Sequence, residues 1–131
     1  MGRNDAYCFA CGKENPIGLK LDFSMEDGKC VARKMIPREY QGYDDVVHGG
    51  ILTTMADEAM VKYLIMEKGE EAMTAKLEMR YRQPTPVGEM LTVSAWEESR
   101  RNHFVRLKAT VALPDGTVTA EGSAQMAILE G

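Results

Sequence analysis

The sequence lacks several features that would each point to a particular class of protein. Its three cysteines are an odd number, which argues against a disulfide framework and fits a reducing compartment. No apolar run approaches the roughly 20 residues of a membrane span, and residues 1–5 are not followed by the apolar core of a signal peptide. Internal repeats and low-complexity segments are also missing. We therefore expect a cytoplasmic protein that does not bind membranes.

The net charge and the length of the chain limit its expected binding partners and its number of domains. Sixteen basic and twenty acidic residues give a net charge of −4, so no general attraction to nucleic acid is expected. The 131 residues suffice for one domain with a hydrophobic core but are too few for two ordinary domains. We interpret residues 1–131 as a single domain, with residues 1–17 as a cysteine-containing lead-in.

Two of the cysteines stand close together in this lead-in. Cys8 and Cys11 have the spacing of half a zinc site or of a redox pair. A closed zinc site needs four ligands, and neither Cys30 nor His48 stands at a spacing that completes a known knuckle. We interpret the pair as a tight turn with small buried thiols before Gly12, and we expect no metal.

Alternating apolar and polar residues indicate strands on both sides of one long apolar segment. Asp27-Gly28 and Pro114-Asp115-Gly116 are typical of hairpin turns. The segment 49–68 has helical periodicity and stops at Gly69, as helices often do. The expected strands cover residues 18–27, 29–36, 72–83, 89–99, 103–113 and 117–129. This order predicts an α+β architecture, with an antiparallel sheet of about six strands packed on one helix.

The faces of two elements follow from their periodicity. On the helix, one stripe is expected to form the core face; it contains Leu52, Met55, Ala56, Ala59, Tyr63 and Met66. Asp57 falls on one flank with Met60 and Leu64, and Glu58 falls on the opposite flank. In the strand 72–83, Met73, Ala75, Leu77, Met79 and Tyr81 share one face, and Thr74 lies on the other. Both helix flanks are largely apolar, which predicts a homodimer at least, and we expect a homotetramer.

The start of the helix carries the best candidates for chemistry. Gly49 and Gly50 let a ligand approach the backbone closely, and the unpaired N–H groups of a first helical turn favour negative charge. Asp57 and Glu58 follow about two turns later, on a helix that is otherwise almost uncharged. A carboxylate in such a place is costly unless it is paired, hydrogen-bonded or functional. A structural role for Asp57 would pair it with Thr53, Lys62 or an arginine.

These motifs occur together in a known family. His48-Gly49-Gly50, an acid nine residues later at Asp57 and a long apolar helix resemble the hotdog-fold acyl-CoA thioesterases of the phenylacetate-pathway (PaaI-like) type. Further similarity to that branch lies in Cys8-Phe9-Ala10-Cys11-Gly12, Asn15-Pro16, Gly18-Leu19, Gln41-Gly42-Tyr43 and the turn from Tyr81 to Gly88. The resemblance covers most of the chain and implies a long central helix wrapped by an antiparallel sheet.

The resemblance also implies roles for individual residues. A backbone N–H of Gly50 or Gly49 would hold the thioester carbonyl, and the helix dipole would polarise it. Asp57 would act as general base on water or as nucleophile toward a substrate bound across a subunit interface. His48 either caps the helix or contacts the thioester. Gln41 would hold the thioester or the attacking water.

Some assignments within this scheme remain open. Asp44 or Asp45 could replace Gln41 in the loop, and Glu58 could replace Asp57, because relatives place the acid at differing helix positions. CoA carries phosphates, which pair well with guanidinium groups. The candidate substrate contacts are Gly49, Thr53, Glu58, Arg80 and Arg82.

The activity implied by the resemblance is hydrolysis of a small- or medium-chain acyl-CoA, or of an aryl acyl-CoA, to free acid and CoA without a cofactor. A non-catalytic domain that binds acyl-CoA or fatty acid in the same groove is the alternative. Hydration of an enoyl thioester fits less well, because the expected arrangement of an Asp and a His is not evident.

Overall fold

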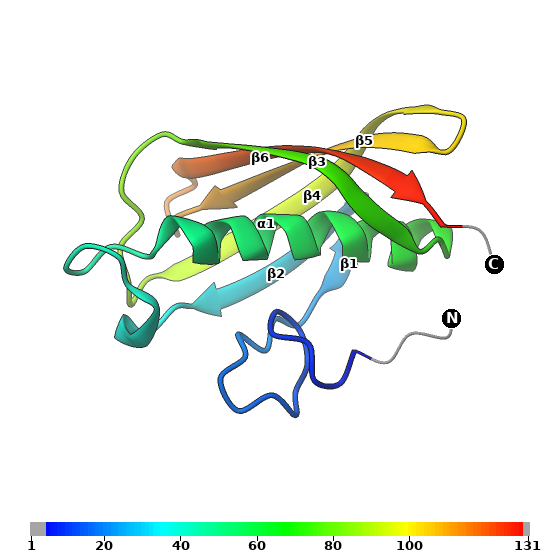
Figure 1. Cartoon of the computed structure of the whole chain (residues 1–131). Coiled ribbons are helices and arrows are strands. Elements are labelled where there is room, and N and C mark those ends of the chain that lie inside the picture. The colour runs from blue at the N-terminus through cyan, green and yellow to red at the C-terminus, as the bar shows by residue number, and fades with distance from the viewer. Residues whose placement is uncertain (1–4, 130–131) are drawn as a thin grey trace.

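The computed structural model describes residues 5–129. One long helix, α1 (Gly49–Tyr63), lies against a six-stranded antiparallel sheet that curls around it (Figure 1). The strand order is β1-β2-β4-β5-β6-β3. The strands are β1 (Ser24–Glu26), β2 (Lys29–Met35), β3 (Ala72–Tyr81), β4 (Met90–Arg101), β5 (Phe104–Ala112) and β6 (Val118–Ile128). This confirms the predicted architecture of the hotdog type. In the described part of the chain, no helix has the length and apolarity needed to cross a membrane.

The hairpins form where turn residues predict them, except that the turn between β4 and β5 is shorter than predicted. Asp27 and Gly28 have positive φ values of 51° and 80° between β1 and β2, and Gly116 has φ 91° between β5 and β6. Glycine adopts such angles without a steric penalty, which explains its place in these turns. The connection predicted over residues 100–102 is shorter, because β4 continues to Arg101 and the chain turns at Asn102, with φ 57°.

The helical segment covers the predicted residues 49–68, but its last turn is a π-helix instead of an α-helix. After α1 the chain continues as a π-helical turn, η2 (Leu64–Lys68), and leaves it at Gly69 with φ 66°. A residue in the left-handed region is the usual way to end a helix, and glycine fits it best. The wider π turn also moves the last residues off the 3.6-residue repeat.

The buried face of the helix differs from the predicted stripe in three residues. Five of the six predicted stripe residues are buried, whereas the side chain of Met66 is 43% exposed. The prediction for Met66 was wrong because the residue lies in the π turn. Met60 and Leu64 were assigned to a flank and are fully buried. The sheet covers that flank closely: a Cβ added at Gly122 of β6 would lie 3.7 Å from Cε of Met60.

Strand β3 forms one edge of the sheet and contains a register shift. It pairs only with β6 among the described strands, and the shift lies between Thr74 and Lys76. A β-bulge of this kind reverses the alternation of side chains on one side of it. Thr74 therefore faces the helix and Met73 is 59% exposed, so the predicted faces of residues 73–75 were wrong. Leu77 and Met79 keep the predicted face.

The first predicted strand is mostly irregular, since only β1 joins the sheet. Leu19 and Leu21 are buried, as their alternation predicts. Their N–H groups, however, donate to the carbonyls of Phe9 and Ala10 at 2.8 and 2.9 Å rather than to another strand. Lys20 between them has φ 54°, which is not an extended conformation. The predicted burial of Leu19 and Leu21 was therefore correct, but their backbone groups bond to the lead-in instead of a neighbouring strand.

Candidate functional site

The N-terminus of α1 is organised by the side chain of His48. This residue is the N-cap, and its Nδ1 accepts a hydrogen bond from the N–H of Gly50 at 2.9 Å. Its carbonyl accepts from the N–H groups of Ile51 and Leu52 at 2.9 and 3.2 Å. A cap of this kind pairs N–H groups that the first helical turn leaves without partners. Capping is thus one of the two roles considered for His48, and the structure shows it.

The two glycines after the cap are in different situations. A Cβ added at Gly50 would lie 3.1 Å from Nδ1 of His48, and one added at Gly49 would lie 3.4 Å from the ring of Tyr81. Gly49 is the first helical residue, so its N–H has no acceptor within the helix. The N–H of Gly50 already donates to His48, and it becomes available to a ligand only when the imidazole moves.

A hollow of about 880 Å³ lies beside this helix start. Its size is within the roughly 300–1,000 Å³ typical of small-molecule sites. Apolar side chains from the loop and from α1 form much of its wall, and Arg82 provides a positive charge. The lining residues are Gln41, Gly42, Tyr43, Val46, Val47, His48, Gly49, Leu52, Tyr81, Arg82, Gln83, Pro84 and Thr85.

Gln41 lines the hollow but also folds the loop before the helix. Its Oε1 accepts from the N–H of Asp45 at 3.1 Å, and its Nε2 donates to Asp44 at 3.4 Å. Its backbone forms an isolated bridge with Val47. Asp44 and Asp45, the other two candidate loop residues, are thus both hydrogen-bonded to the side chain of Gln41.

Tyr81, at the end of β3, belongs to the site although sequence reasoning assigned it no role there. Its hydroxyl lies 2.5 Å from Oγ1 of Thr53 and donates to the carbonyl of Gly49 at 3.1 Å. It therefore ties the edge strand to the first turn of the helix. The sequence did signal its direction, since Tyr81 alternates with Leu77 and Met79 on the helix-facing side.

Asp57 lies further along α1, on the flank covered by β3. Its Oδ1 accepts a hydrogen bond from the hydroxyl of Thr74 at 2.7 Å. The structural partners considered from sequence are engaged elsewhere, Thr53 with Tyr81 and Lys62 with Asp5. Asp57 comes seven positions after Gly50, which corresponds to about 10 Å along the helix axis. Asp57 does not line the hollow at the helix start.

Glu58 points to the other side of the helix. Its carboxylate lies near the sulfurs of Cys8 and Cys11, so the two adjacent acids have different surroundings. Burial raises the pKa of the Glu58 carboxyl. Burial also raises the pKa of the Cys11 thiol above its usual range, and the nearby Glu58 adds to this shift. The structure does not bring Glu58 to the helix start.

The two candidate arginines at the end of β3 line different hollows. Arg82 lines the hollow at the helix start and pairs with Glu121 at 2.9 Å. Arg80 lines a different hollow, of about 530 Å³, together with Trp96 and Lys108. Only Arg82 is therefore placed beside His48 and Gly49.

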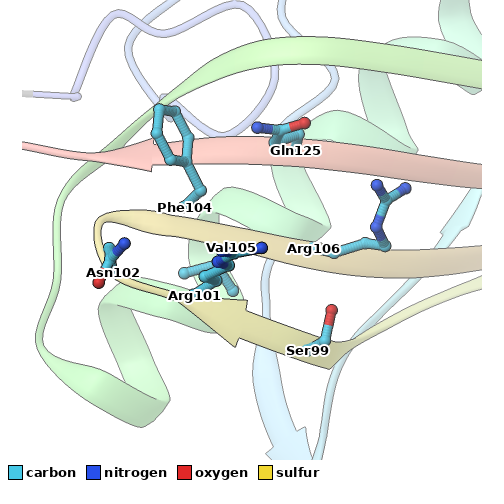
Figure 2. Close-up of a pocket in the computed structure, with 7 residues that line it drawn as sticks. All are labelled: Ser99, Arg101, Asn102, Phe104, Val105, Arg106 and Gln125. Carbon is cyan, nitrogen blue, oxygen red and sulfur yellow. The ribbon is translucent and has the colours of Figure 1, made fainter.

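A third and smaller hollow, of about 360 Å³, lies at the β4–β5 hairpin. Figure 2 shows Ser99, Arg106 and Gln125 extending from three neighbouring strands. Arg106 and Phe104 alternate with the buried Val105, so they occupy the sheet face turned away from the helix. This hollow shares no residue with the one at the helix start.

Comparison with protein families gives one match. Residues 44–120 match the model described as the thioesterase superfamily. The matched range is more than half of the chain and contains His48, Gly49, Gly50 and Asp57. A comparison with curated proteins found no match.

Comparison with solved structures shows the same fold. A crystallised thioesterase superfamily protein has a TM-score of 0.85 and 24% identity over 93% of this chain, which spans only 60% of that protein's length. The PaaI protein of E. coli, from the phenylacetic acid degradation operon, has a TM-score of 0.75 and 20% identity, with 83% of each chain covered. A Streptococcus mutans protein bound to acetyl-CoA has a TM-score of 0.75 and 18% identity, with 83% of this chain and 88% of that chain covered. These similarities establish the hotdog fold.

Proposed function

Because the chain belongs to the thioesterase superfamily, we propose that it hydrolyses the thioester of an acyl-CoA to free acid and CoA. The observation that carries the proposal is the helix start, where Gly49, the residue before Gly50, lines a hollow large enough for an acyl thioester. Backbone donors at a helix N-terminus stabilise the negative charge that develops on a carbonyl oxygen during acyl transfer. In this proposal, Gly49 or Gly50 supplies that donor and Gln41 lies at the edge of the site.

Asp57 is the proposed general base or nucleophile. Its hydrogen bond from Thr74 fixes one carboxylate oxygen and leaves the other for a water or for the thioester carbon. The separation of about 10 Å from Gly50 prevents one chain from presenting both groups to the same carbonyl. We therefore assign the second group to another copy of the chain, which meets the first at the open edge of β3. A homodimer is the smallest assembly that completes the site, and a homotetramer would contain two such dimers.

The lining of the hollow suggests the class of acyl group. Val46, Val47 and Leu52 provide apolar walls, and the rings of Tyr43 and Tyr81 suit a short, medium or aromatic acyl group. Arg82 is available for the phosphates of CoA, since it is about half exposed in its pair with Glu121. The acetyl-CoA bound to the Streptococcus mutans protein and the phenylacetic acid operon of E. coli PaaI are consistent with this class.

Thiol release from a panel of acyl-CoAs tests the proposal. We expect turnover of at least one short-chain, medium-chain or aryl acyl-CoA by the purified protein with no added cofactor. Crotonyl-CoA belongs in the panel, because its conversion without thiol release would indicate hydration instead. Failure to cleave any member would contradict the enzymatic proposal.

Binding of acyl-CoA without turnover is a second candidate function, and one observation favours it. The N–H of Gly50 donates to His48, so this one of the two candidate donors is not available to a carbonyl oxygen until the imidazole moves. Calorimetric titration with a slowly hydrolysed thioether analogue of acyl-CoA separates the two functions. Tight binding combined with no thiol release from the matching thioester would identify a binding domain.

The donor role of the helix start predicts the effect of Gly50→Ala. The added Cβ would lie 3.1 Å from Nδ1 of His48 and would occupy the approach to the backbone. We expect kcat/KM for thioester hydrolysis to fall about 10²-fold, the usual cost of losing one oxyanion contact. Gly116→Ala is the control, because it strains a distant turn and should lower Tm without changing the activity of the folded protein. Equal kcat/KM for Gly50→Ala and the wild type would remove Gly50 from the site.

The contact between Thr74 and Asp57 predicts a positioning effect. Thr74→Val keeps the side-chain shape and removes the hydroxyl that donates to Asp57. Since a hydrogen bond to a charged group contributes about 1.5–3 kcal/mol, we expect kcat to fall about tenfold or more with KM little changed. Thr74→Ser restores the donor and should recover most of the rate. An unchanged kcat in the valine variant would show that Asp57 does not depend on this contact.

A further inference from the structure

Cys8, Cys11 and Glu58 form a cluster that the proposed thioesterase site does not use. The two sulfurs and one carboxylate oxygen all lie within 4.8 Å of one another, and all three residues are partly buried. Glu58 is 47 residues beyond Cys11 in the sequence, and it enters the cluster because the lead-in packs against α1. The fold therefore adds a third potential ligand to the pair of cysteines.

The turn that carries the cysteines is shaped around the first sulfur. The N–H of Ala10 donates to Sγ of Cys8 at 3.3 Å, and the N–H of Gly12 donates to the carbonyl of Cys8 at 2.8 Å. A Cβ added at Gly12 would lie 2.3 Å from the backbone nitrogen of Cys8, so only glycine fits. The backbone of this turn therefore fixes the position of the Cys8 sulfur, as a metal ligand requires.

We propose that Cys8, Cys11 and Glu58 bind a zinc ion, with Asp5 as the fourth ligand. Oδ2 of Asp5 lies 3.6 Å from Sγ of Cys11, at the edge of the cluster. Zinc binds four ligands tetrahedrally, at about 2.3 Å from sulfur and 2.0–2.2 Å from carboxylate oxygen. Ligand atoms in such a site lie roughly 3.5–3.8 Å apart, so small side-chain rotations would bring Cys8, Cys11 and Glu58 to this geometry, while Asp5 would turn in from outside the cluster.

The ligand types in the cluster suit a divalent cation. Zinc would displace the protons of the two thiols, and its charge would compensate the thiolates and carboxylates that then surround it. Lys62 donates to Asp5 at 2.7 Å, so it can hold this ligand from outside, as the second layer of a metal site commonly does. A zinc ion and Lys62 together would offset most of the negative charge.

The ion would have a structural role. Residues 5–23, which include the described part of the lead-in, contain no strand, and Figure 1 shows this segment beside the helix on the side of β1 and β2, away from β3. Long segments without regular structure are uncommon in compact domains unless something orders them. A zinc ion bound by Cys8, Cys11 and Glu58 would attach the lead-in to the middle of α1 and stabilise the folded state.

Metal binding by the wild-type protein is the first test, and it needs no activity measurement. Protein purified under reducing conditions and stripped with a chelator should bind about one Zn²⁺ per chain and gain thermal stability that EDTA reverses. Co²⁺ should give a thiolate-to-metal charge-transfer band and the visible bands of a tetrahedral site. Absence of metal uptake would overturn the proposal, whether the two thiols are then free or joined in a disulfide.

Variants provide the second test and identify the ligands. Cys8→Ser and Cys11→Ser should abolish the cobalt charge-transfer band, and Glu58→Gln should weaken zinc binding by about tenfold or more. Cys30→Ala is the matched control, because this buried thiol lies outside the cluster and its loss should leave metal binding unchanged. Wild-type affinity in Glu58→Gln would remove Glu58 from the site. If a cysteine variant does not fold, the cobalt spectrum of the wild type still decides the question.

Discussion

Asp57→Asn should reduce the rate of thioester hydrolysis about 10²- to 10⁴-fold, the range expected when a general base is lost. An amide cannot accept a proton from water or attack the thioester carbon at a useful rate. The substitution should leave the fold intact, because the amide oxygen can still accept the hydrogen bond that Thr74 donates to Oδ1. We therefore expect kcat to fall while Tm and KM change little.

The measurement is thiol release under saturating acyl-CoA, compared at equal concentrations of folded protein. Glu67→Gln is the matched control: it makes the same change of carboxylate to amide, further along the helical segment and on an exposed residue. The control should retain wild-type kcat. If Asp57→Asn retained it as well, the acid would have only a structural role as the partner of Thr74.

Most of the fold was predictable because it depends on local signals. The hairpin turn at Asp27-Gly28, the helix end at Gly69 and the apolar stripe through Met55 and Ala59 each combine a backbone preference with a short-range pattern. The predictions of strand pairing and side-chain faces failed where tertiary contacts overrode the alternation of apolar and polar residues. Leu19 alternates like a strand residue but pairs with the lead-in, and the bulge beside Thr74 leaves no trace in the hydrophobic pattern.

The candidate site was only partly predictable, for the same reason. The sequence identified the helix start, since His48 and two glycines before an apolar helix form a local motif. It could not show that the His48 imidazole occupies the N–H of Gly50, or that the Tyr81 hydroxyl reaches the first helical turn from β3. The partner of Glu58 was equally hidden, because the contact with Cys8 joins segments that are distant in the sequence.

The proposed division of the site between two chains makes a further prediction. A dimer formed from one Asp57→Asn subunit and one Gly50→Ala subunit should be far more active than the homodimer of either variant. In that dimer, the wild-type Gly50 of the first subunit faces the wild-type Asp57 of the second, whereas the other site carries both substitutions. Because a two-fold dimer has two equivalent sites, we expect about half of the wild-type activity.

Co-expression of the two subunits with different affinity tags allows the mixed dimer to be isolated and assayed. The control is a doubly tagged dimer in which both subunits carry Asp57→Asn, which should show only residual turnover. Recovery would require Asp57 to act on a thioester held at the partner's helix start. A mixed dimer no more active than its parents would place both groups in a single-chain site, and the helix would then have to deform to bridge the roughly 10 Å between Gly50 and Asp57. The buried contacts of Met55, Ala59 and Met60 with the sheet oppose such a deformation, which is why we expect recovery.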